Sequence, residues 1–187
     1  MRLILALALF SLLAAQASAY DVAIKVTVAQ GTLAVGTNVT ILQDDVELYS
    51  QKAGMDGVAD FQLDPGSYLV LLKRGGYPDY VSILEVSGTT NVTRTMSQGM
   101  SYASAYGQIK GPADFSSVSI AAFTGGDIVK RASPNKDGYY LMPYLSGGEY
   151  ELVFTAPGFN EARKPVSLMP AVYSKVNAKL EKPATEP

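Results

Sequence analysis

The chain of 187 residues contains neither histidine nor cysteine. Their absence excludes Ser-His-Asp and Cys-His catalysis, the usual zinc sites, and haem or iron–sulfur ligation. Ser/Lys pairs and paired carboxylates remain. However, Asp64 and Asp137 fall in predicted turns, where aspartate is common because it bonds to the local backbone. We therefore predict that the protein is not an enzyme and that it holds no metal or cofactor.

A strong excess of charge of either sign is also missing. The 15 basic and 17 acidic residues give a formal net charge of −2. No cluster of Lys and Arg is present that could follow a phosphate backbone or bind an anionic lipid surface. Nucleic acid is therefore not an expected partner. Without cysteine, each domain must be held together by packing alone.

Long apolar runs are absent apart from one at the N-terminus. Leu3–Leu13 follows the positive Arg2 and precedes Ala17-Ser18-Ala19. This order of charge, apolar run and small residues predicts a secretory signal peptide, cleaved before Tyr20. The alternative is a retained anchor, but the run is shorter than the about 20 apolar residues that a membrane span needs. We expect a secreted, periplasmic or cell-surface protein with no membrane span after cleavage.

What the chain does contain is one pattern twice. Each copy has an Asp-Gly turn, a glycine-containing turn that leads through tyrosine into an apolar strand, and an aromatic residue after a later glycine. The first copy is Asp56-Gly57, Pro65-Gly66-Ser67-Tyr68 and Gly76-Tyr77, and the second is Asp137-Gly138, Gly147-Gly148-Glu149-Tyr150 and Gly158-Phe159. Tyr68 and Tyr150 lie about 82 positions apart, which is right for a small domain and too long for a solenoid unit.

Alternation of apolar and polar residues between turn signals predicts seven strands per copy and almost no helix. The first copy is expected to hold strands at Val22–Val28, Asn38–Leu42, Val46–Gln51, Val58–Gln62, Ser67–Lys73, Tyr80–Val86 and Thr90–Met96. The second is expected to hold them at Ala103–Lys110, Val118–Phe123, Asp127–Ala132, Tyr139–Pro143, Tyr150–Thr155, Lys164–Leu168 and Val172–Leu180. Short strands at this spacing favour a sandwich.

The expected fold class is all-β, with two tandem seven-stranded β-sandwiches of Greek-key, transthyretin-like type. The predicted parts are a signal peptide at 1–19, a first domain at 20–97, a linker at 98–102, a second domain at 103–181 and a flexible tail at 182–187. The linker is short and rich in small polar residues, and the tail is polar and interrupted by proline.

The second copy resembles the carboxypeptidase regulatory-like domain, which is a transthyretin-like sandwich. The resemblance rests on four motifs: Tyr106-Gly107-Gln108-Ile109-Lys110-Gly111, Asp137-Gly138-Tyr139-Tyr140, Leu145-Ser146-Gly147-Gly148-Glu149-Tyr150 and Pro157-Gly158-Phe159. The first copy is similar but lacks the opening Gly-x-Ile-x-Gly, and it also resembles PEGA-like domains and B-type surface repeats. The resemblance implies an Ig-like accessory module and says almost nothing about function.

Tyrosine is the residue type that suggests a binding surface, because the chain has 12 Tyr and no Trp. Tyr139 and Tyr140 are adjacent on a predicted strand, so one of them should face outward. With Tyr144 nearby, these three are our candidate ligand-binding residues, since an exposed ring can stack on a sugar or anchor a protein. The alternative is that all three are ordinary half-buried strand residues. Tyr68 and Tyr150, by contrast, are predicted to pack inside with their hydroxyls bonded near the rim.

Two N-glycosylation sequons are present, at Asn38-Val39-Thr40 and Asn91-Val92-Thr93. They matter only if the host glycosylates exported proteins, and such triplets also arise by chance in strands rich in Thr and Asn. Asn38 and Asn91 are therefore candidate modification sites.

Together these patterns predict an exported, non-catalytic structural, adhesion or recognition module. Its expected partners are a protein or polysaccharide at the cell surface, or a second copy of the chain. One alternative is a carbohydrate-binding accessory protein, which exposed and nearly coplanar tyrosines would favour. Another is a filament subunit, in which the strand from Tyr20 to Val28 leaves its own sheet and completes a neighbour's sheet.

Overall fold

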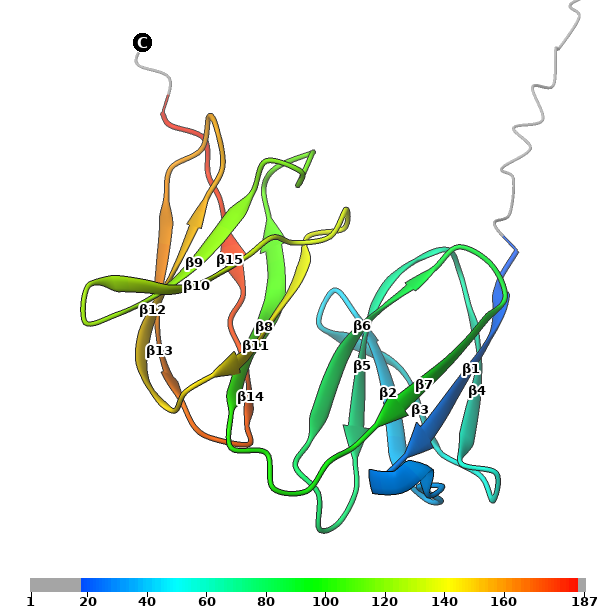
Figure 1. Cartoon of the computed structure of the whole chain (residues 1–187). Helices are drawn as coiled ribbons and strands as arrows, with labels where there is room; N and C mark the ends of the chain where they lie inside the picture. Colours follow the sequence, from blue (N-terminus) through cyan, green and yellow to red (C-terminus); the bar gives the residue numbers. More distant parts are fainter. Residues whose placement is uncertain (1–17, 185–187) are drawn as a thin grey trace, which may run out of the picture.

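The computed structural model describes residues 18–184 and is all-β, with two β-sandwiches in tandem, as the sequence predicted (Figure 1). One 3-10 turn, η1 (Ala29–Gly31), is the helical element among these residues. The predicted signal peptide lies mostly outside the described residues, as do the last three residues of the predicted tail.

The first sandwich packs a three-stranded sheet against a four-stranded one. Their strand orders are β4-β1-β7 and β3-β2-β5-β6. The strands are β1 (Tyr20–Thr27), β2 (Asn38–Gln43), β3 (Val46–Lys52), β4 (Val58–Leu63), β5 (Gly66–Lys73), β6 (Tyr80–Val86) and β7 (Thr90–Thr95). β1 lies in the middle of its sheet, antiparallel to β4 and parallel to β7.

The second sandwich repeats this topology strand for strand. Its sheets have the orders β11-β8-β14 and β10-β9-β12-β13, and β15 also pairs with β8. The strands are β8 (Ala103–Lys110), β9 (Ser119–Thr124), β10 (Asp127–Ala132), β11 (Tyr139–Leu145), β12 (Gly148–Thr155), β13 (Ala162–Leu168), β14 (Tyr173–Lys175) and β15 (Ala178–Lys179). Identical order in both halves means that the two sequence copies are two copies of one fold.

Each sandwich has its own core, built from the inward-facing positions of both sheets. In β12, Tyr150, Leu152 and Phe154 point into the core of the second domain. Tyr68 is buried at the matching place in the first domain. The hydroxyl of Tyr68 donates to the carbonyl of Asp64 at 2.8 Å, and that of Tyr150 to the carbonyl of Ser146 at 3.1 Å. Both tyrosines are therefore scaffold residues, as predicted from the motif.

The last strand of the second domain is broken into β14 and β15, whereas a continuous strand was expected. At the break, the hydroxyl of Tyr140 donates to the carbonyl of Val176 at 2.6 Å. The side-chain oxygen of Asn177 accepts the backbone N–H of Gln108 at 2.9 Å, in place of a ladder bond. Gly107 allows this approach, because a Cβ there would lie 2.2 Å from the Val176 carbonyl oxygen.

Candidate functional site

The two domains meet through sheet faces that point away from their own cores. β5 and β6 of the first domain contact the outer faces of β8, β11 and β14 of the second domain (Figure 1). The contact has an apolar centre in which three residues are fully buried and five are half-buried. These are Leu69, Val81 and Tyr139, with Leu42, Leu71, Ile83, Tyr106 and Tyr173 around them.

Polar bonds lie at one end of this apolar centre, and several start from the β2–β3 turn. Asp44 and Asp45 both have positive φ, of 49° and 69°, as a tight hairpin with the strand twist requires. The backbone N–H of Asp44 donates to the hydroxyl of Tyr139 at 2.9 Å, and its carboxylate accepts from Gln108 at 3.0 Å. The carboxylate of Asp45 lies 2.5 Å from the ammonium of Lys175. This turn therefore ties the first domain to the second.

A further set of bonds lies next to this turn, at the same end of the contact. The hydroxyl of Ser67 donates to the carboxylate of Asp137 at 2.5 Å. The amide of Asn135 donates to Ser67 at 3.0 Å and to Glu85 at 3.1 Å. Asp44, Ser67 and Asp137 line one hollow, so both sets of bonds lie at the same end of the buried apolar centre and join the two sandwiches there.

A groove opens at one end of this contact, and residues of the segment that joins the domains help to line it. Its volume is about 490 Å³. Both domains and the joining segment supply its walls, and no lining residue is charged. The lining residues are Tyr80, Val81, Thr95, Ser97, Met100, Tyr102, Ser104, Leu141, Pro143, Tyr144 and Tyr173. Domain interfaces are common places for ligand sites, and we call this feature the tyrosine groove.

The four tyrosines form two pairs with their ring planes steeply inclined. Tyr102 and Tyr144 have ring centroids 6.0 Å apart and an interplanar angle of 90°. Tyr80 and Tyr173 pair across the domain boundary, also at 6.0 Å, with an angle of 63°. Burial raises the pKa of Tyr173 to about 12, and the nearby Tyr80 and Tyr144 add to the rise. The hydroxyl of Tyr173 is therefore protonated at neutral pH.

Tyr144 reaches the groove because β11 carries a bulge. Pairing of β11 with β8 shifts between Met142 and Leu145, so that one extra residue stands in β11. Tyr144 takes up this residue with φ of 61°, a conformation that costs a residue other than glycine about 1–3 kcal/mol. Its side chain is 72% exposed, and the ammonium of Lys130 lies 5.5 Å from the ring centroid. The β1–β4 pairing of the first domain has no such shift.

The three candidate tyrosines thus have three different environments. Tyr140 is fully buried in the second core, and burial raises its pKa. Tyr139 does face outward from its own sandwich, but the first domain covers it and leaves it 2% exposed. Burial raises the pKa of Tyr139, and the neighbouring carboxylates add to the rise. One of this adjacent pair, Tyr139, thus faces outward as expected but is not open to solvent, and Tyr144 alone of the three presents an exposed ring. Ligand binding by these residues stays a prediction.

Sequence reasoning did not select the groove residues of the first domain. Tyr80 and Val81 begin β6, and Met100 lies in the predicted linker. One signal was available in the chain. β5 and β6 carry apolar residues on both faces, as in Val70, which faces the core, and Leu71, which faces the second domain, and a strand that is apolar on both faces is buried on both.

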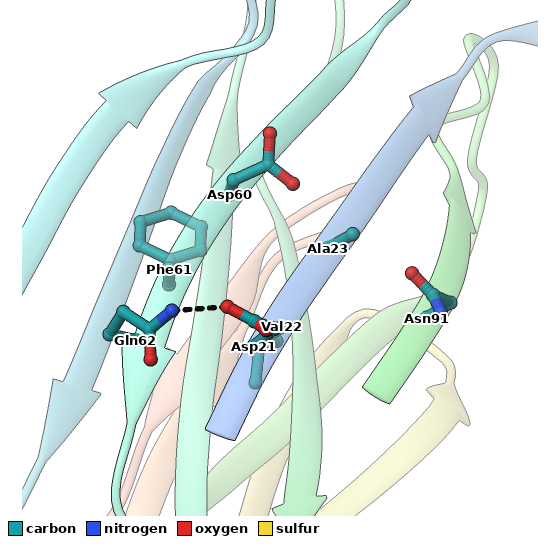
Figure 2. Close-up of a pocket in the computed structure, with 7 residues that line it drawn as sticks. All are labelled: Asp21, Val22, Ala23, Asp60, Phe61, Gln62 and Asn91. Atoms are coloured by element: carbon teal, nitrogen blue, oxygen red, sulfur yellow. Dashed lines mark hydrogen bonds between the residues drawn. The ribbon is translucent and has the colours of Figure 1, made fainter. Parts of the chain in front are cut away.

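A second hollow lies on the outer face of the sheet β4-β1-β7 and has a volume of about 360 Å³. Figure 2 shows Asp60, Ala23 and Asn91 in a row across the three strands, with Asp21 bonded to Gln62. The small side chain of Ala23 leaves the hollow open. At the corresponding place the second domain has Tyr106, which packs against the first domain. The hollow is thus the uncovered counterpart of the domain contact.

The two sequons differ in their surroundings. Asn91 is exposed on β7, at the edge of this hollow (Figure 2). Asn38 is half-buried on β2, between β3 and β5, and its amide donates to the hydroxyl of Ser50 at 3.1 Å. Glycosylation at Asn38 and Asn91 stays a prediction, and Asn91 is the more accessible of the two.

Two further features are absent from residues 18–184. No group of three or more His, Cys, Asp or Glu side chains is placed to hold a metal ion. Among the described elements, no helix has the length and apolar character to cross a membrane.

Comparison with known proteins gave structural similarity only. No family model matches the sequence, and no curated protein matches it significantly. The TIE protein of Bacillus anthracis is 15% identical with a TM-score of 0.38, over 88% of this chain and 34% of that one. GBS52, the minor pilin of Streptococcus agalactiae, is 14% identical with a TM-score of 0.37, over 90% and 98%. A DUF3823 family protein of Parabacteroides merdae is 14% identical with a TM-score of 0.39, over 82% and 98%. At these values no function is inferred from the similarity.

Proposed function

We propose that this chain is an exported, non-catalytic recognition module that binds an uncharged ligand in the tyrosine groove. The observation that carries the proposal is Tyr144, whose exposed ring is held in a costly backbone conformation at the groove wall. Strain of this kind is retained where surrounding structure enforces it, and it is concentrated at functional sites. A bulge that re-aims a side chain is a common way to build such a site.

The composition of the groove supports an uncharged ligand. Its polar side chains are all hydroxyls, and its remaining lining residues are apolar. A charged ligand would lose hydration on entering and meet no charged residue in the lining. The domain contact supports the same proposal, because Tyr80 and Tyr173 come from different domains and are held together by it.

The alternatives predicted from the sequence are less well supported. An accessory protein that binds flat polysaccharide chains would use coplanar rings, whereas the groove rings are paired at steep angles. A filament built by exchange of the first strand would need β1 free, whereas β1 is bonded on both sides within its own sheet. Each domain also has one outer sheet face that corresponds to the face its partner uses in the domain contact, and both of these faces are polar. The face of β12 and β13 carries Glu151 and Arg163, and the face of β1 and β4 carries Asp21 and Asp60.

The groove can be tested with isotope-labelled protein and a panel of capped uncharged peptides and neutral oligosaccharides. At least one probe is expected to shift the amide resonances of Tyr102, Tyr144 and Tyr173 in a saturable way. The same probe should leave those around Tyr49, an exposed tyrosine on β3, unchanged. Shifts confined to other surfaces, or none with any probe, would exclude the groove as the binding site.

Export is a separate prediction, based on the sequence of residues 1–19. Protein recovered from outside the cytoplasm is expected to begin at Tyr20, because Ala17-Ser18-Ala19 fits the pattern that signal peptidase cleaves. N-terminal sequencing or intact mass measures this directly. An exported protein that begins at Met1 would contradict cleavage and favour the retained anchor.

A further inference from the structure

The geometry points to a more specific occupant, an inference that rests on the tyrosine groove being the binding site. We infer that the groove binds an extended, proline-rich peptide segment in the polyproline II conformation. Three features of the groove carry this: its lack of charge, its hydroxyl donors and the angles between its rings.

Hydrogen bonding favours such a peptide. A polyproline II segment has no internal hydrogen bonds, so all of its carbonyls need donors from elsewhere. A proline residue supplies a carbonyl and no N–H, which means that the ligand brings acceptors and almost no donors. The groove offers the opposite set, because the hydroxyls of Ser97 and the tyrosines can donate to a ligand, whereas those of Thr95 and Ser104 are paired with Thr27 and Tyr173.

The ring geometry favours it as well. In each tyrosine pair one ring faces the edge of the other, which makes a corner and not a flat platform. A polyproline II helix has three residues per turn and so presents ridges separated by grooves. Proline-rich segments dock into aromatic-lined grooves because their rings fill such corners and little conformational entropy is lost. A flat sugar ring would contact only one wall of each corner.

Charge and position agree with this occupant. The lining contains no ionisable group apart from the phenols, which matches a proline-rich segment free of charged residues. Tyr144 and Tyr102 are 72% and 54% exposed, so their rings are open to a peptide laid along the surface. Tyr80 and Tyr173 are half-buried and form the deeper part of the groove.

The test is calorimetric titration of the whole exported protein with a capped nonaproline peptide, which forms three turns of the helix. Saturable binding is expected for nonaproline, and none for a capped Gly-Ser peptide of equal length. Tyr144→Ser and Tyr102→Ser should each weaken binding about tenfold, the effect of losing a well-placed aromatic anchor. Tyr49→Ser is the matched control, because Tyr49 is 47% exposed on β3 and is not part of the groove.

The outcomes separate this inference from the proposed function. No binding of nonaproline, or equal binding by Tyr144→Ser, Tyr102→Ser and the native protein, would overturn the inference. If cellohexaose bound instead and both groove variants lost it, the occupant would be a neutral sugar and the groove would stand. If cellohexaose and the wider panel also left the groove resonances unchanged, the proposed function would fail together with this inference.

Discussion

Replacing Tyr150 by alanine is expected to destabilise the second domain by about 3–5 kcal/mol, the usual cost of deleting a buried aromatic ring. The side chain is 8% exposed and packs in the core with Leu152 and Phe154. Since a domain is stable by only about 5–15 kcal/mol, the loss is a large share of the total. Thermal and chemical unfolding of the purified variant measure it.

Tyr150→Phe is the matched control, because it keeps the ring and removes only the hydroxyl bond to Ser146. We expect it to cost about 0.5–1.5 kcal/mol. Tyr68→Ala should have the same large effect on the first domain, where Tyr68 is 2% exposed. A Tyr150→Ala variant that melts like the native protein would show that the repeated motif is not a packing motif.

The second large effect is expected for Tyr139→Ala, which removes the ring at the centre of the domain contact. Tyr139 packs against Leu69 and Val81 of the first domain and accepts the N–H of Asp44. Its loss should cost about 3–5 kcal/mol of coupling between domains, by the same cavity argument. Differential scanning calorimetry should then show two separate transitions, whereas we expect the native protein to unfold as one coupled unit.

Tyr144→Ala serves as the control for this variant, since the ring of Tyr144 is 72% exposed. Surface substitutions of this kind usually change stability by no more than about 0.5 kcal/mol. The two variants therefore separate a tyrosine that holds the domains from one that faces the groove. If Tyr139→Ala still unfolded in one transition at the native temperature, the ring of Tyr139 would not be what couples the domains.

The sequence was sufficient to predict the fold because the signals for strands and turns are local. Alternation over a few residues identified the strands, and Asp-Gly and Pro-Gly pairs identified the turns between them. The repeat of these signals after about 82 residues, as in Tyr68 and Tyr150, identified two copies of one domain. The same alternation placed Tyr150, Leu152 and Phe154 on the buried face of β12, where the structure has them.

The features that the sequence did not predict all depend on contacts between residues that are distant in the chain. The break between β14 and β15 depends on Tyr140 and Gly107, which meet Val176 only in the folded domain. The bulge that turns Tyr144 outward depends on the register of β11 against β8. Neither can be read from a short window of sequence, because neither residue type demands the conformation by itself.

By itself, then, the sequence determined the fold class, the duplication and which face of each strand is apolar. It left open whether an outward-facing side chain meets water or a second domain, because alternation has only two faces and says nothing about what covers them. Tyr139 and Tyr144 show the difference: one is covered by the first domain, and the other is re-aimed by a single extra residue. The tyrosine groove joins Tyr80 to Tyr173, and only the docking of the two sandwiches brings these residues together.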